Sequence, residues 1–257
     1  MDFLPPPPDR IDHLVEGMTM LDPTAERGIL VALPHPDDES FSSAGTMALA
    51  SDAGVPVTYL CGTYGDMGRR MGSPFFTNRE AMRDIREREL AEACAILGAD
   101  YELLGMRDRT VEFEDPNAVA ARIRSVIDRL DPSVVITFYP GHAVHPDHDA
   151  MGLATHLAVS GMQGVKPLLL AVAVGDREAL LETLGPRQVA VDIRSVRQRK
   201  LDALRAHRSQ TGMMFQRWQD VQNEDDQART YFEENMTVER FYRLNGAPVV
   251  PSLRRPA

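Results

Sequence analysis

Two short clusters of histidine and acidic residues are the groups in this sequence best suited to chemistry. Residues 35–39 read His-Pro-Asp-Asp-Glu, and residues 145–148 read His-Pro-Asp-His. Each cluster follows directly on an apolar run that predicts a buried strand. Together they offer two imidazoles and a carboxylate to a divalent ion, with a second carboxylate and another imidazole beside it. This combination favours metal-assisted hydrolysis over other reaction classes.

The first cluster contains the adjacent carboxylates Asp37 and Asp38. Because the two residues are neighbours, their side chains must point in different directions. One can bind a metal ion while the other faces the reacting water, within the reach that a general base needs. Alternatively, the segment is a polar turn between strand and helix, in which Glu39 and Ser40 satisfy free amide groups at the helix start.

The second cluster places His145 and His148 at the start of a predicted helix. One imidazole can bind metal while the other lies one turn away, near a reacting carbonyl, and Asp147 could orient an imidazole through its second nitrogen. A plain helix start, capped by Asp147 or Asp149, is the alternative. Two such clusters after two buried strands favour the functional interpretation. The donor set suits Zn²⁺ and also Fe²⁺, and Zn²⁺ is favoured because hydrolysis needs no redox chemistry.

Arginines near these clusters could bind an anionic substrate, because guanidinium groups pair with carboxylates through two hydrogen bonds. The candidates are Arg69 and Arg70 in the glycine-rich stretch 62–78, and Arg107, which with Arg109 follows a predicted strand. For each of them, solvated surface arginine is the alternative. The arginines of residues 83–88 are expected on a solvated helix face with Glu87 and Glu89. The polar cluster 207–211 is expected to be a helix end that could reach the pocket rim.

Composition narrows the class of protein. The 257 residues are 43% hydrophobic and 26% charged, as in globular proteins, with a net charge of −10 that disfavours nucleic acid and anionic membranes as partners. Cys61 and Cys94 are expected to be reduced core residues. We see no signal peptide, and the longest apolar run, 168–174, is too short to span a bilayer. The chain is therefore expected to be cytoplasmic.

Strand-like and helix-like segments alternate along the chain, which predicts a layered α/β fold with a parallel sheet. The predicted strands are 28–33, 55–61, 101–104, 133–139, 168–174 and 188–193. The predicted helices are 39–53, 79–97, 117–130, 149–160, 196–207 and 237–244. In open parallel sheets, sites form beyond the carboxyl ends of strands. We therefore expect both histidine clusters and the glycine-rich stretch to meet at one edge of the sheet.

Four segments carry a resemblance to a known family: Ala-Leu-Pro-His-Pro-Asp-Asp-Glu at 32–39, the long phrase 61–80, residues 104–115 and Thr-Phe-Tyr-Pro-Gly-His-Ala-Val-His-Pro-Asp-His-Asp at 137–149. Between about residues 28 and 211 the chain resembles the LmbE/PIG-L family of zinc-dependent N-deacetylases. Within that family, the longer phrases are similar to the bacillithiol biosynthesis deacetylases of the second type.

The resemblance implies a role for each position that matches the family motif. It implies that His35, Asp38 and His148 bind the metal. Asp37 is then the general base, and His145 stabilises charge and protonates the leaving amine. Some relatives carry Arg and Tyr where this chain has Val144 and Ala143, so that His142, Tyr139 or Arg69 would have to polarise the amide oxygen or grip the substrate instead.

The resemblance also implies a fold, a substrate and an assembly. The fold is a single-domain, Rossmann-like three-layer α/β/α sandwich with a mostly parallel sheet, here over residues 28–247, between an extended arm (1–27) and a tail (248–257). The substrate is a small amino sugar, N-acetylglucosaminyl malate, and relatives assemble as hexamers or trimers. Amide cleavage of bacillithiol S-conjugates, deacetylation of another amino sugar, and non-catalytic binding of metal or sugar are the alternatives.

Overall fold

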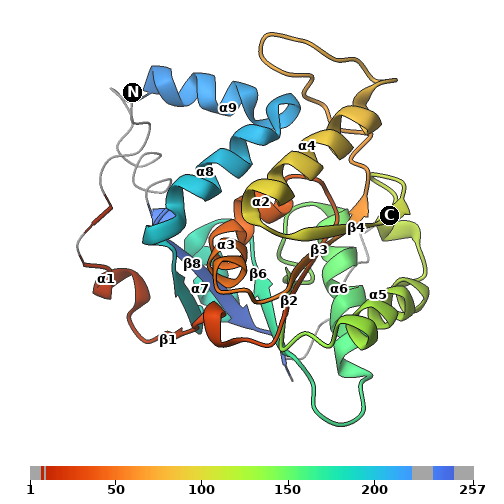
Figure 1. Ribbon diagram of the computed structural model, residues 1–257. Helices are drawn as coiled ribbons and strands as arrows, with labels where there is room; N and C mark the ends of the chain where they lie inside the picture. The colour runs from red at the N-terminus through yellow and green to blue at the C-terminus, as the bar shows by residue number, and fades with distance from the viewer. Residues whose placement is uncertain (1–6, 9, 222–233, 246–257) are drawn as a thin grey trace.

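The computed structural model describes residues 7, 8, 10–221 and 234–245, and within these ranges the chain forms one mixed sheet (Figure 1). Its strands are β1 (Thr19–Met20), β2 (Ile29–Leu33), β3 (Val57–Thr63), β4 (Asp100–Met106), β5 (Val134–Phe138), β6 (Leu168–Val172), β7 (Val189–Asp192) and β8 (Val238–Arg243). They lie in the order β1-β7-β8-β6-β5-β2-β3-β4, and only β8 runs against its neighbours among these strands.

The strand order reverses between β2 and β5. From β2 the chain continues outward through β3 and β4, whereas β5 and β6 extend the sheet on the other side of β2. Loops leaving β2 and β5 therefore diverge to opposite faces and leave a crevice at the carboxyl edge, which is where ligands bind in sheets of this kind. The two histidine clusters follow these two strands.

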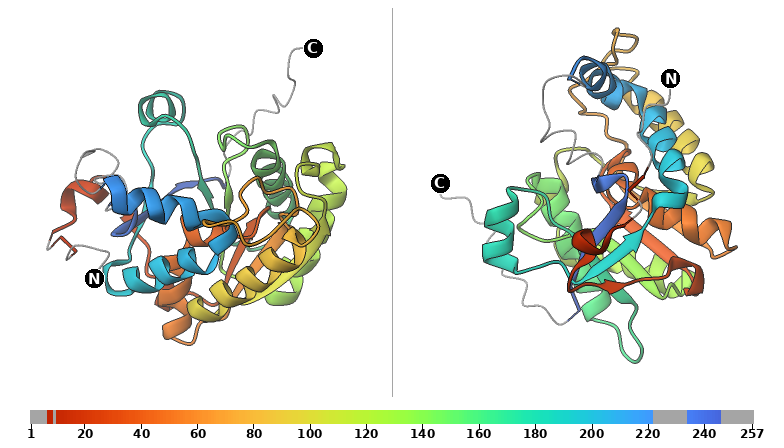
Figure 2. Two further views of the ribbon diagram at one scale, coloured as in Figure 1. Left: turned by 90° about the horizontal axis from the view of Figure 1, so that it is seen from above. Right: turned by 90° about the vertical axis from the view of Figure 1, so that its left-hand side faces the viewer.

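Helices cover both faces of the sheet (Figure 2). They are α1 (Asp12–Val15), α2 (Asp38–Ser42), α3 (Ala44–Asp52), α4 (Met82–Leu97), α5 (Pro116–Leu130), α6 (Pro146–Ser160), α7 (Arg177–Leu184), α8 (Arg197–Ala206) and α9 (Arg208–Val221). Alternate residues of β2 face opposite layers: Val31 packs with α3, α4 and α8, and Leu30 packs with α5 and α6. The result is a three-layer α/β/α sandwich, as predicted.

The predicted strands and most predicted helices are confirmed, but the predicted helix at 237–244 is wrong. This segment is β8, which pairs antiparallel with both β6 and β7. The apolar residues Val238, Phe241 and Tyr242 have helical spacing, yet β-branched and aromatic side chains also favour strands. Glu239 belongs in the buried strand because Lys200 neutralises it, with Nζ 2.7 Å from Oε1.

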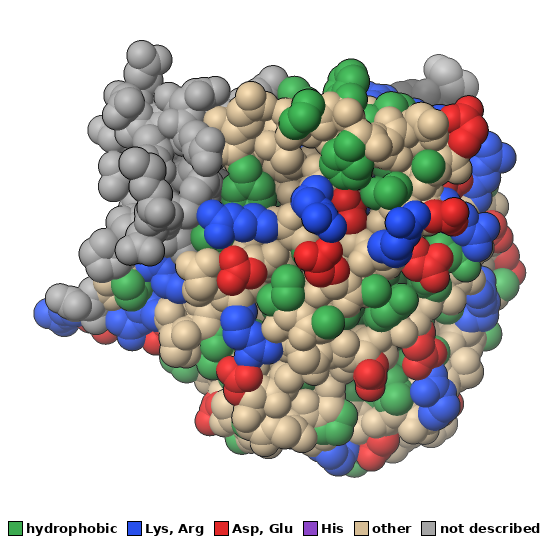
Figure 3. Space-filling view, turned by 45° about the horizontal axis from the view of Figure 1, so that its top comes forward, with side chains coloured by type: hydrophobic (Ala, Val, Ile, Leu, Met, Phe, Trp, Pro, Cys, Tyr) green, Lys and Arg blue, Asp and Glu red, His purple; other side chains and the backbone are tan. Residues whose placement is uncertain are grey.

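The structure describes part of the predicted arm, 1–27, but none of the predicted tail. Within the predicted arm, α1 precedes β1, and β1 pairs parallel with β7. The predicted tail, 248–257, lies outside the described residues. No helix in the described part of the chain has both the length and the apolar character needed to cross a membrane. Figure 3 shows acidic and basic side chains interspersed over one face, so the net negative charge is not gathered there into a single patch.

Candidate active site

His35 lies directly after β2, at the point where the strand order reverses, and its two ring nitrogens face different groups. Nε2 lies 3.2 Å from a carboxylate oxygen of Asp108 and 3.2 Å from one of Asp147. Because carboxylates only accept, Nε2 carries the hydrogen. Burial alone would lower the pKa of His35, but its contacts with Asp108, Asp147 and Asp38 raise it well above the ordinary histidine value. An imidazole that binds a metal is neutral, and with the hydrogen on Nε2 the lone pair of His35 Nδ1 points to the other side.

His148 lies in the first turn of α6 and turns a lone pair toward the same point. Its Nδ1 is 3.1 Å from the carbonyl oxygen of Ala143, which can only accept, so Nδ1 carries the hydrogen. The ring stacks on Phe138 with centroids 4.0 Å apart, and this contact fixes its plane. Nε2 of His148 then lies 3.1 Å from Nδ1 of His35. Two lone pairs facing each other at this distance favour a cation between them.

Asp38 supplies a carboxylate to this pair of imidazoles. Its oxygens lie 3.4 Å from Nδ1 of His35 and 3.3 Å from Nε2 of His148. Burial opposes its ionisation, but His148 and His35 hold the pKa of Asp38 well below its usual range. Donor atoms bound to one tetrahedral zinc ion at about 2.0–2.2 Å are separated by about 3.3 Å. The two nitrogens have about this spacing, and so does each nitrogen with its nearer Asp38 oxygen, so His35, Asp38 and His148 offer a donor set for such an ion.

Two other groups of side chains around His35 have the spacing of metal ligands: His145 with His148, and Asp108 with Asp147. The second group is less free to bind an ion. Asp147 is fully buried, and its two oxygens accept hydrogen bonds from the backbone amides of Arg109 (2.7 Å) and Val111 (3.1 Å). These bonds suit a carboxylate that orients a metal-binding imidazole from behind, the arrangement common around protein metal sites.

His145 caps the N-terminus of α6 and stands beside both other histidines. Its ring centroid is 4.9 Å from that of His35 and 5.2 Å from that of His148. Nδ1 accepts a hydrogen bond from the amide of Asp147, so the neutral ring carries its hydrogen on Nε2. Burial lowers the pKa of His145, and His35 and His148 lower it further. A neutral imidazole with a fixed donor can bond a developing oxyanion.

Asp37 is the second carboxylate of the first cluster, and it contacts an arginine that the sequence did not place here. Its Oδ2 lies 2.9 Å from Nη2 of Arg86, which is 3% exposed. Burial raises the pKa of Asp37, although the Arg86 guanidinium opposes that rise. The prediction of a solvated helix face is therefore wrong for Arg86 and for Glu89, which is also buried. Helical periodicity alone gave no sign that Arg86 pairs with Asp37 or that Glu89 accepts hydrogen bonds from Ser209 inside the protein.

The glycine-rich stretch wraps around this arginine. Arg86 Nη1 donates to the carbonyl of Gly65 at 3.0 Å, and a Cβ added at Gly65 would lie 2.3 Å from the same nitrogen. Gly65 also has a φ of +63°, which favours glycine. The loop is held to the site by Asp108, whose Oδ2 accepts a hydrogen bond of 2.9 Å from the amide of Met67. Asp108 was missed, although its place just after a strand was a usable signal.

The predicted substrate-binding arginines differ in their surroundings. Arg70 donates to the backbone carbonyl of Gln210 at 2.9 Å and so fastens the glycine-rich loop to α9. Arg69 and Arg107 are exposed, and their side chains have no hydrogen bond or ion pair with any other described residue. Both belong to loops that adjoin His35 through Asp108. They are thus available to an anionic ligand.

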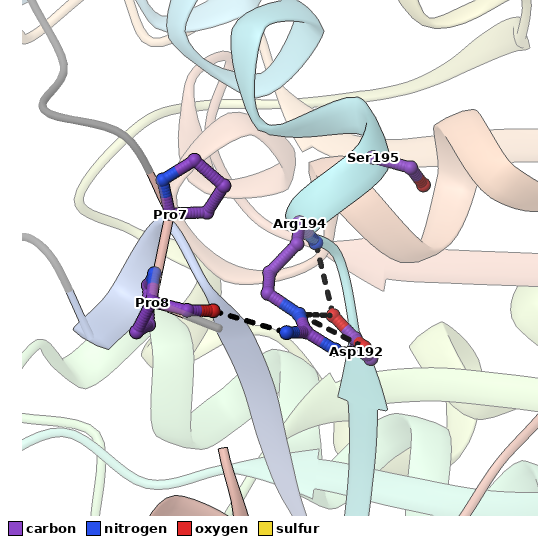
Figure 4. Close-up of a pocket in the computed structure, with 5 residues that line it drawn as sticks. All are labelled: Pro7, Pro8, Asp192, Arg194 and Ser195. Atoms are coloured by element: carbon purple, nitrogen blue, oxygen red, sulfur yellow. Dashed lines mark hydrogen bonds and ion pairs between the residues drawn. The ribbon is translucent and has the colours of Figure 1, made fainter. Parts of the chain in front are cut away.

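A surface groove elsewhere is lined by Pro7, Pro8, Asp192, Arg194 and Ser195 (Figure 4). Arg194 Nη2 lies 2.7 Å from Oδ2 of Asp192, and Nη1 donates to the carbonyl of Pro8 at 3.0 Å. These charges neutralise each other within the groove. None of the residues from the two histidine clusters lines it.

Comparisons with known proteins show the family of this chain. Residues 30–159 match the family model described as PIG-L, GlcNAc-PI de-N-acetylase. The chain is 50% identical over 194 residues to the probable N-acetyl-alpha-D-glucosaminyl L-malate deacetylase 2 of Bacillus cereus, covering 74% of this chain and 87% of the relative. It is 45% identical over 212 residues to the Bacillus subtilis protein of the same name, covering 81% of this chain and 95% of that relative.

A solved structure shares the fold. The N,N'-diacetylchitobiose deacetylase from Pyrococcus horikoshii superposes with a TM-score of 0.69 at 22% sequence identity, over 95% of this chain and 94% of that chain. At this level of identity the likeness concerns the fold alone.

Proposed function

Because this chain belongs to the PIG-L/LmbE family of de-N-acetylases, we propose that it is a metal-dependent hydrolase that removes the acetyl group from N-acetylglucosaminyl malate. The observation that carries the proposal is the convergence of His35 Nδ1 and His148 Nε2, 3.1 Å apart, on the Asp38 carboxylate, whose Oδ2 lies 3.4 Å from the first nitrogen and whose Oδ1 lies 3.3 Å from the second. We assign these three residues as the metal ligands and Zn²⁺ as the ion, with Fe²⁺ as the alternative.

An ion bound by these residues supplies Lewis acidity and brings the pKa of water toward neutrality. The remaining steps belong to the side chains around it. Asp37 accepts a proton from the attacking water as the water oxygen bonds to the acetyl carbon. Its burial strengthens it as a base, because the raised pKa lies closer to neutral pH.

His145 acts on the opposite side of the reacting amide. The hydrogen on its Nε2 bonds the carbonyl oxygen as negative charge develops there. The carbon–nitrogen bond then breaks as His145 delivers its Nε2 proton to the nitrogen, the proton that Asp37 took from the water replaces it on His145, and the acetyl group and the free amine leave as acetate and amine. His145 suits both tasks because Nδ1 is engaged by the Asp147 amide, which leaves Nε2 as the donor.

The malate part of the substrate is supported by the names of the Bacillus relatives and by the exposed arginines. We propose that Arg69 and Arg107 bind its carboxylates, and that Arg70 contributes chiefly by fixing the loop. Assembly as a homo-oligomer and a cytoplasmic location stay predictions, and sedimentation of the purified protein would test the first.

The test is direct. Purified protein with Zn²⁺ is incubated with N-acetylglucosaminyl malate, a bacillithiol S-conjugate and N-acetylglucosamine, and free amine and acetate are measured. We expect equal amounts of both products, with the highest kcat/KM on N-acetylglucosaminyl malate. Faster cleavage of the S-conjugate would replace the proposed substrate, and metal binding without acetate release would reject the hydrolase.

A further inference from the structure

Asp37 has a backbone conformation that its own residue type does not favour. Its φ is 115° and its ψ is −26°, in the left-handed region that residues other than glycine seldom occupy. The Asp37 carboxylate contacts Arg86, whereas that of Asp38 lies beside His35 and His148, so one can serve as base while the other binds metal. Something in the surroundings must hold this residue in place.

The backbone of Asp37 is held by Glu39. Oε2 of Glu39 accepts the hydrogen bond of the Asp37 amide at 3.0 Å, while Oε1 accepts one of 2.6 Å from the Ser40 hydroxyl. Glu39 is completely buried. An acidic residue that only caps a helix can remain solvated. Burial of the Glu39 carboxylate costs free energy unless a partner compensates it, so the burial requires a further explanation.

His207 provides that explanation. Its Nε2 lies 2.7 Å from Oε1 of Glu39, and its ring is also completely buried, at the junction of α8 and α9. The contact fixes the Glu39 carboxylate through Oε1, while Oε2 accepts the hydrogen bond of the Asp37 amide. A residue 168 positions away in sequence therefore sets the place of the carboxylate that holds the Asp37 backbone. The sequence indicated only a helix end here.

We propose that Glu39 and His207 are positioning residues of the reaction, which act by holding Asp37 in its left-handed conformation. The proposal rests on the proposed function of Asp37 as general base. Displacing a reacting group by about 1 Å can cost about a hundredfold in rate. Neither residue faces the point where the three metal-binding atoms converge, so the loss should appear in turnover rather than in metal binding.

The decisive variant is His207→Leu, which keeps a side chain of similar bulk and removes the contact with Glu39. We expect kcat on N-acetylglucosaminyl malate to fall about tenfold to a hundredfold, while KM and the metal content per chain stay unchanged. Exchange of the Asp37 amide hydrogen should also become faster, which reports the conformation without reference to activity. His207→Gln, which can still donate to Glu39, should restore most of kcat.

The matched control is Lys200→Met. Lys200 and Glu239 form another buried pair at 2.7 Å, and Glu239 accepts hydrogen bonds from the α3 amides of Gly45 and Thr46, rather than from Asp37 or any residue that holds it. This variant should lose stability and keep kcat. If kcat falls equally in Lys200→Met and His207→Leu, a general structural role replaces the proposal.

Two further outcomes distinguish a failure of this positioning role from a failure of the proposed role of Asp37 as general base. If Asp37→Asn keeps normal turnover, the proposed role of Asp37 is wrong. If Asp37→Asn loses turnover while His207→Leu keeps it, the positioning role alone is wrong. Should His207→Leu not fold, Glu39→Leu decides, because leucine is of similar bulk and has no acceptor for the Asp37 amide; unchanged kcat there overturns the proposal.

Discussion

Nδ1 of His35 and Nε2 of His148 lie 3.1 Å apart, although the opposite nitrogen of each ring is already turned toward an acceptor. This relationship joins two loops that are 113 residues apart in sequence. It orients both lone pairs toward one point beside Asp38. The prediction of a metal-dependent reaction depends on it.

Removing the metal should abolish activity reversibly. Because the three donors are held by their own hydrogen bonds, the site should persist after dialysis against a chelator and refill when Zn²⁺ is added. Amine release from N-acetylglucosaminyl malate, measured before chelation, after it and after re-addition, checks this. Full turnover by protein shown to be free of metal would refute metal dependence.

Asp147→Asn should weaken metal binding without eliminating it. The carboxylate orients His35 from behind, and loss of such a partner usually costs about tenfold to a hundredfold in metal affinity. Titration with Zn²⁺ against a competing chelator measures the change, with the surface variant Asp128→Asn as the control. A loss as complete as in His35→Ala would instead make Asp147 a direct ligand, within the group that also contains Asp108.

Asp37→Asn should lower kcat by about a hundredfold or more, the usual contribution of general acid–base catalysis. The amide keeps the shape of the side chain but cannot take the proton. Metal content, measured by elemental analysis, should remain at the wild-type value, because Asp37 contacts Arg86 rather than the three proposed ligands. A parallel loss of metal would show that Asp37 belongs to the ligand set.

Arg107→Ala should raise KM for N-acetylglucosaminyl malate by about tenfold to a hundredfold, since a hydrogen-bonded charge pair contributes about 1.5–3 kcal/mol. N-acetylglucosamine, which has no carboxylate, should show little change. Arg124→Ala, at a partly buried arginine of α5 that pairs with Asp128, is the control. Equal effects on both substrates would remove Arg107 from carboxylate recognition.

Cys61 and Cys94 should be unreactive in the folded protein. Burial raises the pKa of both thiols, so at pH 8 neither forms the thiolate that alkylating reagents attack. Mass spectrometry after iodoacetamide treatment should find no label in the native protein and two labels per chain in denaturant. Rapid native labelling, or fewer than two free thiols after unfolding, would contradict their role as reduced core residues.

The sheet was predictable because its central strands are buried on both faces and read as continuous apolar runs. Ile29 to Leu33 and Val134 to Phe138 are of this kind. β8 was not predictable in the same way, because its apolar residues repeat at helical spacing and its buried Glu239 depends on Lys200 from another element. Strand order likewise depends on tertiary packing that no local pattern carries.

The candidate site was predictable as a set of residue types and positions, because strand ends of a parallel sheet share one edge. Arg86, Asp108 and His207 were not assigned to it. Each is a charged or polar residue whose burial depends on a partner distant in sequence, and charged residues on helices are most often solvated. Only the folded arrangement distinguishes Arg86, beside Asp37, from its solvent-facing neighbour Arg88.

The most direct test of the central claim is an anomalous-scattering map, recorded at the zinc absorption edge, from crystals of active protein. We expect one strong peak per chain, bound by His35 Nδ1, His148 Nε2 and an oxygen of Asp38, with Asp37 and His145 beside it and outside the ligand set. A peak between Asp108 and Asp147, or active crystals without any metal peak, would contradict it.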